Sequence, residues 1–251
     1  MQVECQRSAE SRLLPRFETM GTGATMTKRR LAGIFTCLGI LVLMNLAASA
    51  QASNDGVIKM NGGRKTILMR APSQPFTPAV RASSNLVTIY STLGNGDHVY
   101  STLSGFGILG TNTGQILPEM VANGFRPNAD HVVTEVQVGA THLQGTNVLV
   151  VSLNQDNYGV PGKPLHTWRF SNLPVVWSCC TLQTGKYVTG IPVKKGKLYW
   201  IVLRPEKQFQ DTWDIWADNY AEKQGKYFSN NTGTGWNTSY QTLSAVGVFG
   251  R

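Results

Sequence analysis

The sequence is poor in cysteine and has none of the short motifs that mark common catalytic sites. Among its 251 residues there are four cysteines, and only Cys179 and Cys180 follow residue 50. The chain contains no H-E-x-x-H, no G-x-S-x-G and no paired C-x-x-C, the patterns of zinc peptidases, serine hydrolases and zinc or redox sites. Because a hydrolase needs a readable group of catalytic residues, the sequence predicts no catalytic residue, no cofactor and no enzymatic activity. Four scattered histidines are interpreted as surface residues: His98, His131, His142 and His166.

Helical patterns and fixed-period repeats are also missing after residue 50. The absence of a repeat argues against a propeller or a solenoid. What the chain has instead is about ten short segments rich in β-branched and aromatic residues, separated by Gly, Pro and Asn turns. This pattern predicts an all-β fold for residues 85–251, an antiparallel β-sandwich that is jelly-roll-like.

One hairpin is predicted to lie at the centre of this fold. Residues 147–153 are apolar on both alternating faces, which is typical of a strand near the middle of a sheet. A polar stretch follows, and residues 160–163, Val-Pro-Gly-Lys, suit a type II turn. The chain returns as a strand over residues 165–170. We therefore expect two strands joined by a long loop.

A glycine-rich hexad, residues 105–110, matches the dinucleotide-binding pattern G-x-G-x-x-G. That pattern functions only between a strand and a helix, where the helix N-terminus faces a pyrophosphate. The residues that follow the hexad form no helical stripe. We interpret the hexad as a flexible loop.

The N-terminal region resembles an export signal. Residues 26–30 are basic, residues 31–47 are apolar, and residues 48–50 are Ala-Ser-Ala. These three features in this order predict a secretory signal peptide that is cleaved after Ala50. The alternative is an uncleaved membrane anchor, and Met26 is a second candidate for the start. The sequence thus predicts a secreted protein with no membrane segment after cleavage.

The formal charge of +9 is concentrated outside the predicted domain. Residues 1–50 have six Lys/Arg and three Asp/Glu, residues 51–84 have five and one, and residues 85–251 have twelve and ten. The domain is therefore close to neutral, and no cluster of basic residues predicts binding to nucleic acid. Residues 51–84 are rich in small and polar residues, which indicates a flexible basic linker.

The two remaining cysteines are adjacent, and several states stay open for them. Cys179 and Cys180 are reduced thiols, a vicinal disulfide, or partners in an intermolecular bridge, and a catalytic thiol is the remaining alternative. Neighbouring Cα atoms lie about 3.8 Å apart, closer than in most disulfides. An oxidising exterior nevertheless allows either kind of bridge.

Two stretches resemble a known family. One is the strand followed by Gly159-Val160-Pro161-Gly162, and the other is the later strand over residues 196–203, Gly-Lys-Leu-Tyr-Trp-Ile-Val-Leu. Together with the opening residues 88–92 and the closing residues 246–250, they resemble the choice-of-anchor R domain of secreted bacterial proteins. The resemblance covers about residues 86–250 and implies an extracellular β-sandwich with no assigned enzymatic activity.

A binding surface is predicted around residues 213–218. As a strand, this segment places Asp214, Trp216 and Asp218 on one face. An exposed indole beside carboxylates suits stacking on a sugar ring, and Tyr220 and Trp236 extend the same candidate site. Ordinary core packing of Trp216 is the alternative. The oxygen-bearing side chains nearby also form a candidate Ca²⁺ site: Asp211, Asp214, Asp218 and Asn219.

These features together lead to three hypotheses about function. The first is a secreted, non-enzymatic β-sandwich that acts as an interaction module at the cell surface or in the extracellular matrix, with a surface protein or a polysaccharide as partner. The second is a carbohydrate-binding module that uses the Trp216 face. The third is an extracellular hydrolase, which would require paired carboxylates in a cleft.

Overall fold

The computed structural model describes residues 56–59, 65–68, 85–114, 117–208 and 210–251. The predicted signal peptide and most of the predicted linker lie outside these residues. Every regular element in the described part of the chain is a β-strand. Within the same part, no helix is long and apolar enough to cross a membrane.

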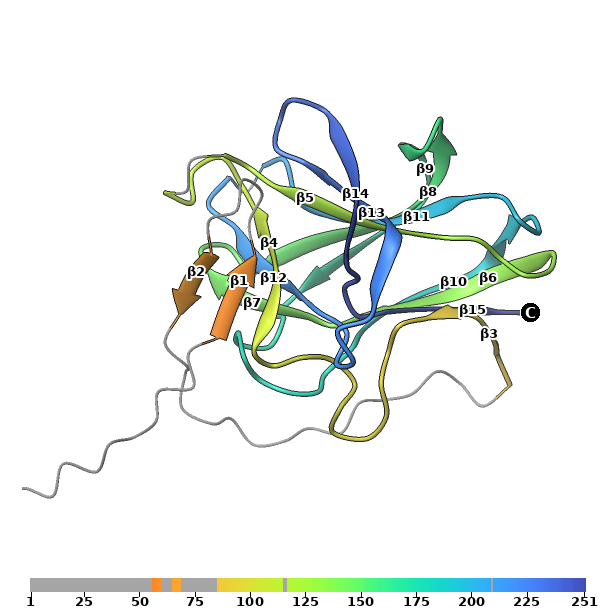
Figure 1. Ribbon diagram of the computed structural model, residues 1–251, viewed down its shortest axis with the longest axis horizontal. Helices are drawn as coiled ribbons and strands as arrows, with labels where there is room; N and C mark the ends of the chain where they lie inside the picture. Colours follow the sequence, from red (N-terminus) through yellow and green to blue (C-terminus); the bar gives the residue numbers. More distant parts are fainter. Residues whose placement is uncertain (1–55, 60–64, 69–84, 115–116, 209) are drawn as a thin grey trace, which may run out of the picture. The chain divides into compact units, whose positions relative to one another are not determined.

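The strands form three sheets (Figure 1). The five-stranded sheet has the order β2(Lys65–Leu68), β1(Gly56–Lys59), β4(Ser104–Leu109), β12(Trp213–Ala217), β7(Ala140–Gln144). The four-stranded sheet has the order β10(Gln183–Val193), β6(His131–Val138), β15(Val246–Gly250), β3(Val87–Ser91). The six-stranded sheet has the order β14(Trp236–Thr242), β13(Gln224–Asn231), β5(Met120–Phe125), β11(Tyr199–Pro205), β8(Val148–Asn157), β9(Val160–Ser171).

The prediction of an antiparallel β-sandwich is confirmed. All pairings between the named strands are antiparallel except that of β1 with β4. The long-range pairs are nested, which means that an outer pair of strands encloses the inner pairs along the chain. The first strand of the domain, β3, pairs with the last, β15, while β4 pairs with β12 and β8 pairs with its neighbour β9. This nesting is what a jelly-roll-like arrangement requires.

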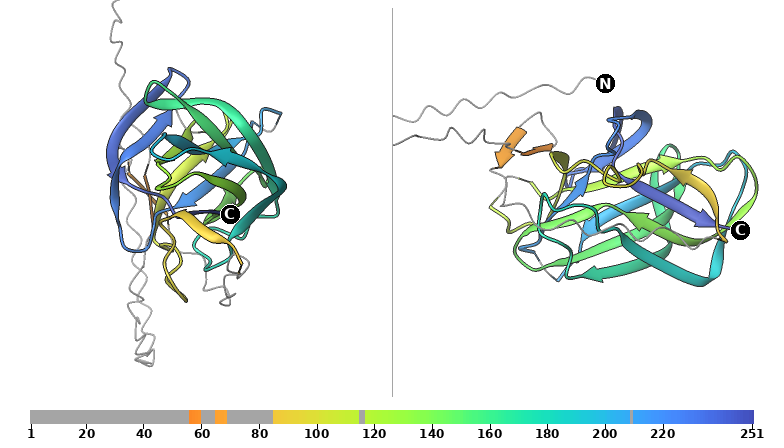
Figure 2. Two further views of the ribbon diagram at one scale, coloured as in Figure 1. Left: turned by 90° about the vertical axis from the view of Figure 1, so that its right-hand side faces the viewer. Right: turned by 90° about the horizontal axis from the view of Figure 1, so that it is seen from below.

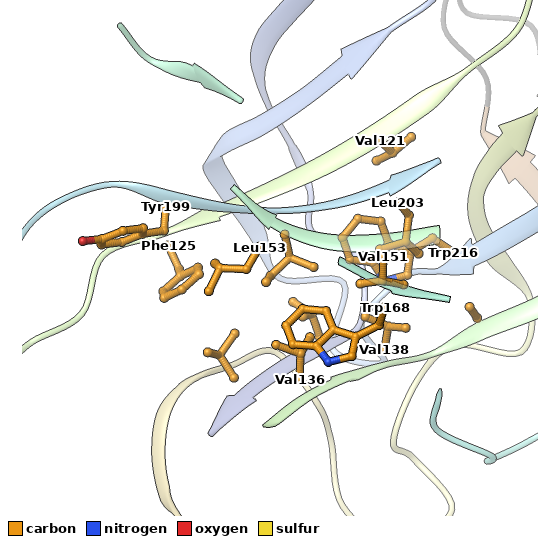
Figure 3. Close-up of a cluster of buried hydrophobic side chains, with 14 of the residues drawn as sticks. Val121, Phe125, Val136, Val138, Val151, Leu153, Trp168, Tyr199, Leu203 and Trp216 are labelled. Atoms are coloured by element: carbon orange, nitrogen blue, oxygen red, sulfur yellow. The ribbon is translucent and has the colours of Figure 1, made fainter. Parts of the chain in front are cut away.

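A single large core lies between the six-stranded sheet and the two smaller sheets (Figure 3). Alternate residues of β8 and β11 point into it, among them Leu153 and Leu203, and β6 contributes Val136 and Val138 from the other side. Trp216 of β12 lies in the same cluster and is fully buried. Side chains alternate between faces along a strand, so β8 and β11 each give every second residue of their buried stretches to this core.

The predicted central hairpin is present, but its turn is elsewhere. β8 runs on to Asn157 and β9 starts at Val160, so the connection is the two-residue turn Tyr158-Gly159. Both turn residues have positive φ, 54° and 89°, as in the type I′ turns that match the twist of paired strands. The predicted type II turn at residues 160–163 is therefore wrong, because these residues belong to β9, and Val160 and Pro161 pair with β8. The register shifts between Leu153 and Asp156 accommodate extra residues on β9 between Pro161 and His166.

The second face of the six-stranded sheet is also largely buried. Trp200 and Val202 of β11 pack there with Ala122 of β5. The sheet curls until its two edge strands, β9 and β14, come into contact, and the hydroxyl of Thr238 donates to the carbonyl of Gly159 at 3.1 Å. Figure 2 (left) shows the blue β13–β14 pair and the green β8–β9 hairpin approaching each other. The curl explains why an outward-facing tryptophan is buried.

One sequence interpretation needs correction. The glycine-rich hexad is the buried strand β4, and it is not a flexible loop. A Cβ on Gly105 would lie 2.7 Å from the Trp216 carbonyl oxygen of the neighbouring strand, so the glycine serves close packing. Within residues 51–84, which the sequence predicts to be a linker, β1 and β2 form a hairpin, and β1 pairs with β4. β-branched residues in both segments favour strands.

Candidate functional site

The predicted Trp216 surface does not exist, because both faces of β12 are covered. Trp216 is fully buried, and its Nε1 donates to the Ala245 carbonyl at 2.9 Å. On the opposite face, Trp213 and Ile215 pack against Val176 and Trp177. The sequence predicts the strand and its alternation correctly, but the alternative for Trp216, core packing, is what the structure shows.

The four residues of the candidate Ca²⁺ site do not converge. Asp211 is exposed and accepts from the Thr146 hydroxyl, whereas Asp214 is buried against His142. The side-chain amide of Asn219 donates to the Leu243 carbonyl. Among the described residues, no group of three or more His, Cys, Asp or Glu side chains could hold a metal ion. Asp211 lies before β12, and Asp218 lies after it in a β-bridge with Ser244. The described structure therefore does not bring the predicted ligands together.

Asp214 forms instead a buried pair with His142. His142 Nδ1 lies 2.7 Å from Asp214 Oδ1, and Nε2 lies 3.1 Å from the Gly145 carbonyl oxygen. Burial raises the pKa of the Asp214 carboxyl above its usual range, and the hydrogen bond with His142 lowers it in part. Both ring nitrogens of His142 therefore lie within hydrogen-bonding distance of protein oxygen atoms.

Tyr220 and Trp236 lie apart from Trp216 and from each other. Tyr220 is half-exposed, and its ring centroid is 4.1 Å from that of His98. Trp236 is half-buried on the curled face of the six-stranded sheet, where it packs against the Trp200 cluster. Only these two of the predicted aromatic residues reach the surface, and they do not form one site with Asp214 or Asp218.

The structure joins Cys179 and Cys180 in a vicinal disulfide. Cys180 is fully buried and Cys179 is partly exposed. Both sulfur atoms contact the carbonyl oxygen of Asp97, at 3.5 and 3.3 Å. The buried half of the bridge belongs to a small cluster with Tyr100 and Ala217, so the pair anchors the loop before β10.

A pocket of about 560 Å³ opens at one end of the sandwich. Its walls come from the β5–β6 turn, the β8–β9 hairpin and the end of β10 with the β10–β11 turn, which lie on the right in Figure 1. This volume is within the range of about 300–1,000 Å³ that is typical of ligand sites. The lining residues mix charged, polar and apolar side chains: Arg126, Gln155, Asp156, Leu165, Pro192, Gly196, Lys197, Leu198 and Tyr199.

The one carboxylate in the lining, Asp156, is held by neighbouring N–H groups. Trp200 Nε1 donates to its Oδ1 at 2.8 Å, and the backbone N–H of Gly159 lies within 3.2 Å of both carboxylate oxygens. Arg126 donates through Nη1 to the Gly196 carbonyl at 2.6 Å, and its guanidinium lies over the ring of Tyr227. These contacts fix the shape of the pocket without a ligand.

The tip of the β8–β9 hairpin presents the most exposed aromatic residue in the described chain. Tyr158 is fully exposed and has a φ of 54°. Beside the tip, Thr238 of β14 contacts Gly159, and Tyr240 on the same strand is two-thirds exposed. Two accessible tyrosines thus lie on the two edges that the curled sheet brings together.

Sequence reasoning missed both the pocket and the tyrosine at the tip. The pocket needs segments around residues 126, 156, 165 and 197 to meet at one end of the fold, which no local pattern reveals. Tyr158-Gly159 does contain a signal, since glycine at a two-residue turn flanked by strands indicates a hairpin. The nearby Pro161-Gly162 is a stronger turn pattern, and the sequence therefore predicts the turn at the wrong position.

Compared with protein-family models, curated proteins and solved structures, the chain matches none of them. The interpretation of the site therefore depends on its own geometry.

Proposed function

We propose that this protein is a secreted, non-enzymatic interaction module of the bacterial cell surface or extracellular matrix, and that it contacts its partner through the tip of the β8–β9 hairpin. The resemblance to choice-of-anchor R domains belongs to the same proposal. The observation that carries it is the fully exposed Tyr158 in a left-handed backbone conformation.

A tyrosine is an unfavourable residue at this turn position. Left-handed backbone costs an L-residue with a Cβ about 1–2 kcal/mol, and type I′ turns favour Asn, Asp or Gly. The ring of Tyr158 is fully exposed, so burial in the free protein does not offset this cost. Tyrosine is enriched among residues that dominate binding energy at interfaces. A contact with a partner gives a reason for a tyrosine at the tip.

The non-enzymatic part of the proposal is supported by the arrangement of titratable groups. Glycoside hydrolysis needs two carboxyl groups across a cleft, and the pocket lining contains one, Asp156. That carboxylate accepts from Trp200 and Gly159. In the buried His142–Asp214 pair, both imidazole nitrogens face protein acceptors. These arrangements favour binding over the third hypothesis, an extracellular hydrolase.

Carbohydrate binding is the second candidate function. Because Trp216 is buried, we propose the end pocket as its site in place of the Trp216 face. The pocket combines hydrogen-bonding groups, such as Gln155 and Asp156, with apolar walls, such as Leu165 and Leu198. Sugars present hydroxyls at the edges of the ring and C–H groups on its faces, so they require both kinds of contact.

The test of the tip contact is the partition of the full chain between cells, matrix and medium in the producing bacterium. We expect Tyr158→Asn to move most of the protein into the medium while its thermal midpoint stays at or above that of the wild type. Leu103→Ala, at a half-exposed position away from the tip, is the control and should not change the partition. Unchanged retention of the Tyr158→Asn variant would overturn the tip as the contact.

A further inference from the structure

The end pocket contains two cations that no carboxylate neutralises. Arg126 and Lys197 both line it and both are exposed. Among the described residues, ion pairs within 4.0 Å engage other side chains, such as Lys194 with Asp130, and none involves Arg126 or Lys197. The hydrogen bonds of Arg126 go to neutral groups, the Gly196 carbonyl and the Tyr227 hydroxyl. The cationic charge of the pocket is therefore available to a ligand.

Asp156 does not reverse this charge. Its carboxylate accepts hydrogen bonds from Trp200 Nε1 and the Gly159 N–H, so protein donors already engage it. The lining as a whole has two positive side chains and one negative side chain. Guanidinium and ammonium groups in such a position favour a carboxylate, sulfate or phosphate.

The rest of the lining suits a hydroxylated ring. Tyr199 accepts from the Lys194 N–H at 3.0 Å, and its own hydroxyl hydrogen has no acceptor among the described residues. The side-chain amide of Gln155 likewise has no partner in the described part of the chain, so it can both donate and accept. Leu165, Pro192 and Leu198 supply apolar walls. A small inorganic anion would use the cations alone, whereas an acidic sugar uses all three kinds of contact.

We infer that this pocket binds a carboxylated sugar ring, such as a uronate residue of an acidic extracellular polysaccharide. The inference rests on the second candidate function, carbohydrate binding at the pocket, and it is independent of the contact at Tyr158. Arg126 and Lys197 hold the carboxylate, Gln155 and Tyr199 bind ring hydroxyls, and the apolar walls lie against the ring.

The test is calorimetric titration of the full chain with three probes: a galacturonic acid trisaccharide, the neutral galactose trisaccharide and inorganic phosphate. We expect the acidic trisaccharide to bind about tenfold or more tightly than the neutral one, because each charge-assisted hydrogen bond favours it. Its affinity should also fall as salt is added, since the cations are exposed.

Variants separate the roles of the two cations. Lys197→Gln and Arg126→Gln are each expected to weaken binding of the acidic trisaccharide about tenfold and to leave the neutral one unchanged. Lys195→Gln, on the same turn but outside the lining, is the matched control. Because Lys197 is exposed and makes no ion pair among the described residues, its variant keeps the test valid even where loss of Arg126 disturbs folding.

The outcomes are distinguishable. Equal affinity for both trisaccharides would overturn the carboxylate inference and leave carbohydrate binding in place. Binding of phosphate alone would show an anion site that is not a sugar site, and it would overturn the inference. No binding of any probe would overturn both the inference and the second candidate function, while the partition of Tyr158→Asn would still decide the first.

Discussion

Asp156 links the surface of the protein to its interior. Its carboxylate lines the pocket, accepts from the fully buried indole of Trp200 and caps the turn at Gly159. A buried N–H that loses its acceptor costs free energy because water cannot replace the lost bond. One side chain thus shapes the pocket and satisfies a buried donor.

We predict that Asp156→Ala lowers the free energy of unfolding by about 1–3 kcal/mol, since the Trp200 N–H loses its acceptor. For a domain of this size the thermal midpoint should fall by about 2–4 °C per kcal/mol. Asp156→Asn keeps an oxygen acceptor and should lose much less. Equal losses in the two variants, measured by thermal unfolding, would show that the hydrogen bond to Trp200 does not matter for stability.

We predict that two tyrosines, the partly buried Tyr90 and the buried Tyr100, make stability fall at alkaline pH. Burial raises the pKa of Tyr90 to about 12 and also raises the pKa of Tyr100, whose hydroxyl donates to the Ser178 carbonyl. In the unfolded chain tyrosine ionises near pH 10. The folded state therefore holds more protons than the unfolded state between about pH 10 and 12, and stability decreases as pH rises through that window.

The matched variants are Tyr90→Phe at the partly buried position and Tyr158→Phe at the exposed tip. We expect Tyr90→Phe to lessen the loss of stability between about pH 10 and 12, and Tyr158→Phe to leave it unchanged. Urea unfolding at several alkaline pH values measures both. Identical pH dependence of Tyr90→Phe and the wild type would contradict the effect of burial on Tyr90.

At the scale of the element, the β8–β9 hairpin combines a predictable pairing with an unusual turn. Its strands alternate as the sequence indicates, and β8 lies inside the sheet between β9 and β11. The turn is set by the register with β9, in which Asn157 pairs with Val160. Only two residues remain to connect them, and both must adopt positive φ.

We predict that Tyr158→Asn raises the free energy of unfolding by about 0.5–1 kcal/mol. Asparagine tolerates the left-handed conformation, and Asn-Gly is the preferred type I′ pair. Equilibrium unfolding in urea gives the change, with Tyr240→Asn on β14 as an exposed control without positive φ. A loss of stability in Tyr158→Asn would show that the tyrosine ring stabilises the free protein, which would weaken the argument for a partner.

At the scale of the whole molecule, the last strand closes the fold. β15 lies between β3 and β6, and Val246 and Val248 are fully buried in the core. The two strands that it joins, β3 and β6, are separated by about 40 residues in the chain. Long-range pairing of this kind makes the sandwich depend on both ends of the domain.

We predict that deletion of residues 246–251 abolishes the cooperative thermal transition, because β3 loses its only partner strand in the four-stranded sheet. A milder test compares Leu203→Ala with Leu103→Ala. Leu203 is fully buried and Leu103 is half-exposed, so the first should cost about 2–5 kcal/mol and the second about 0.5 kcal/mol or less. A truncated chain that still unfolds cooperatively would show that β15 is dispensable.

The sequence by itself determined the all-β class, the sandwich and most of the strands, because period-two alternation and turn residues are local signals. It also placed Trp213, Trp216 and their neighbours correctly on opposite faces of one strand. Only the tertiary structure decided which faces are covered, since burial depends on what packs against a strand and not on the strand itself. Trp216 therefore became a core residue, while Tyr158 and the pocket emerged from segments that meet only when the sheets curl and close.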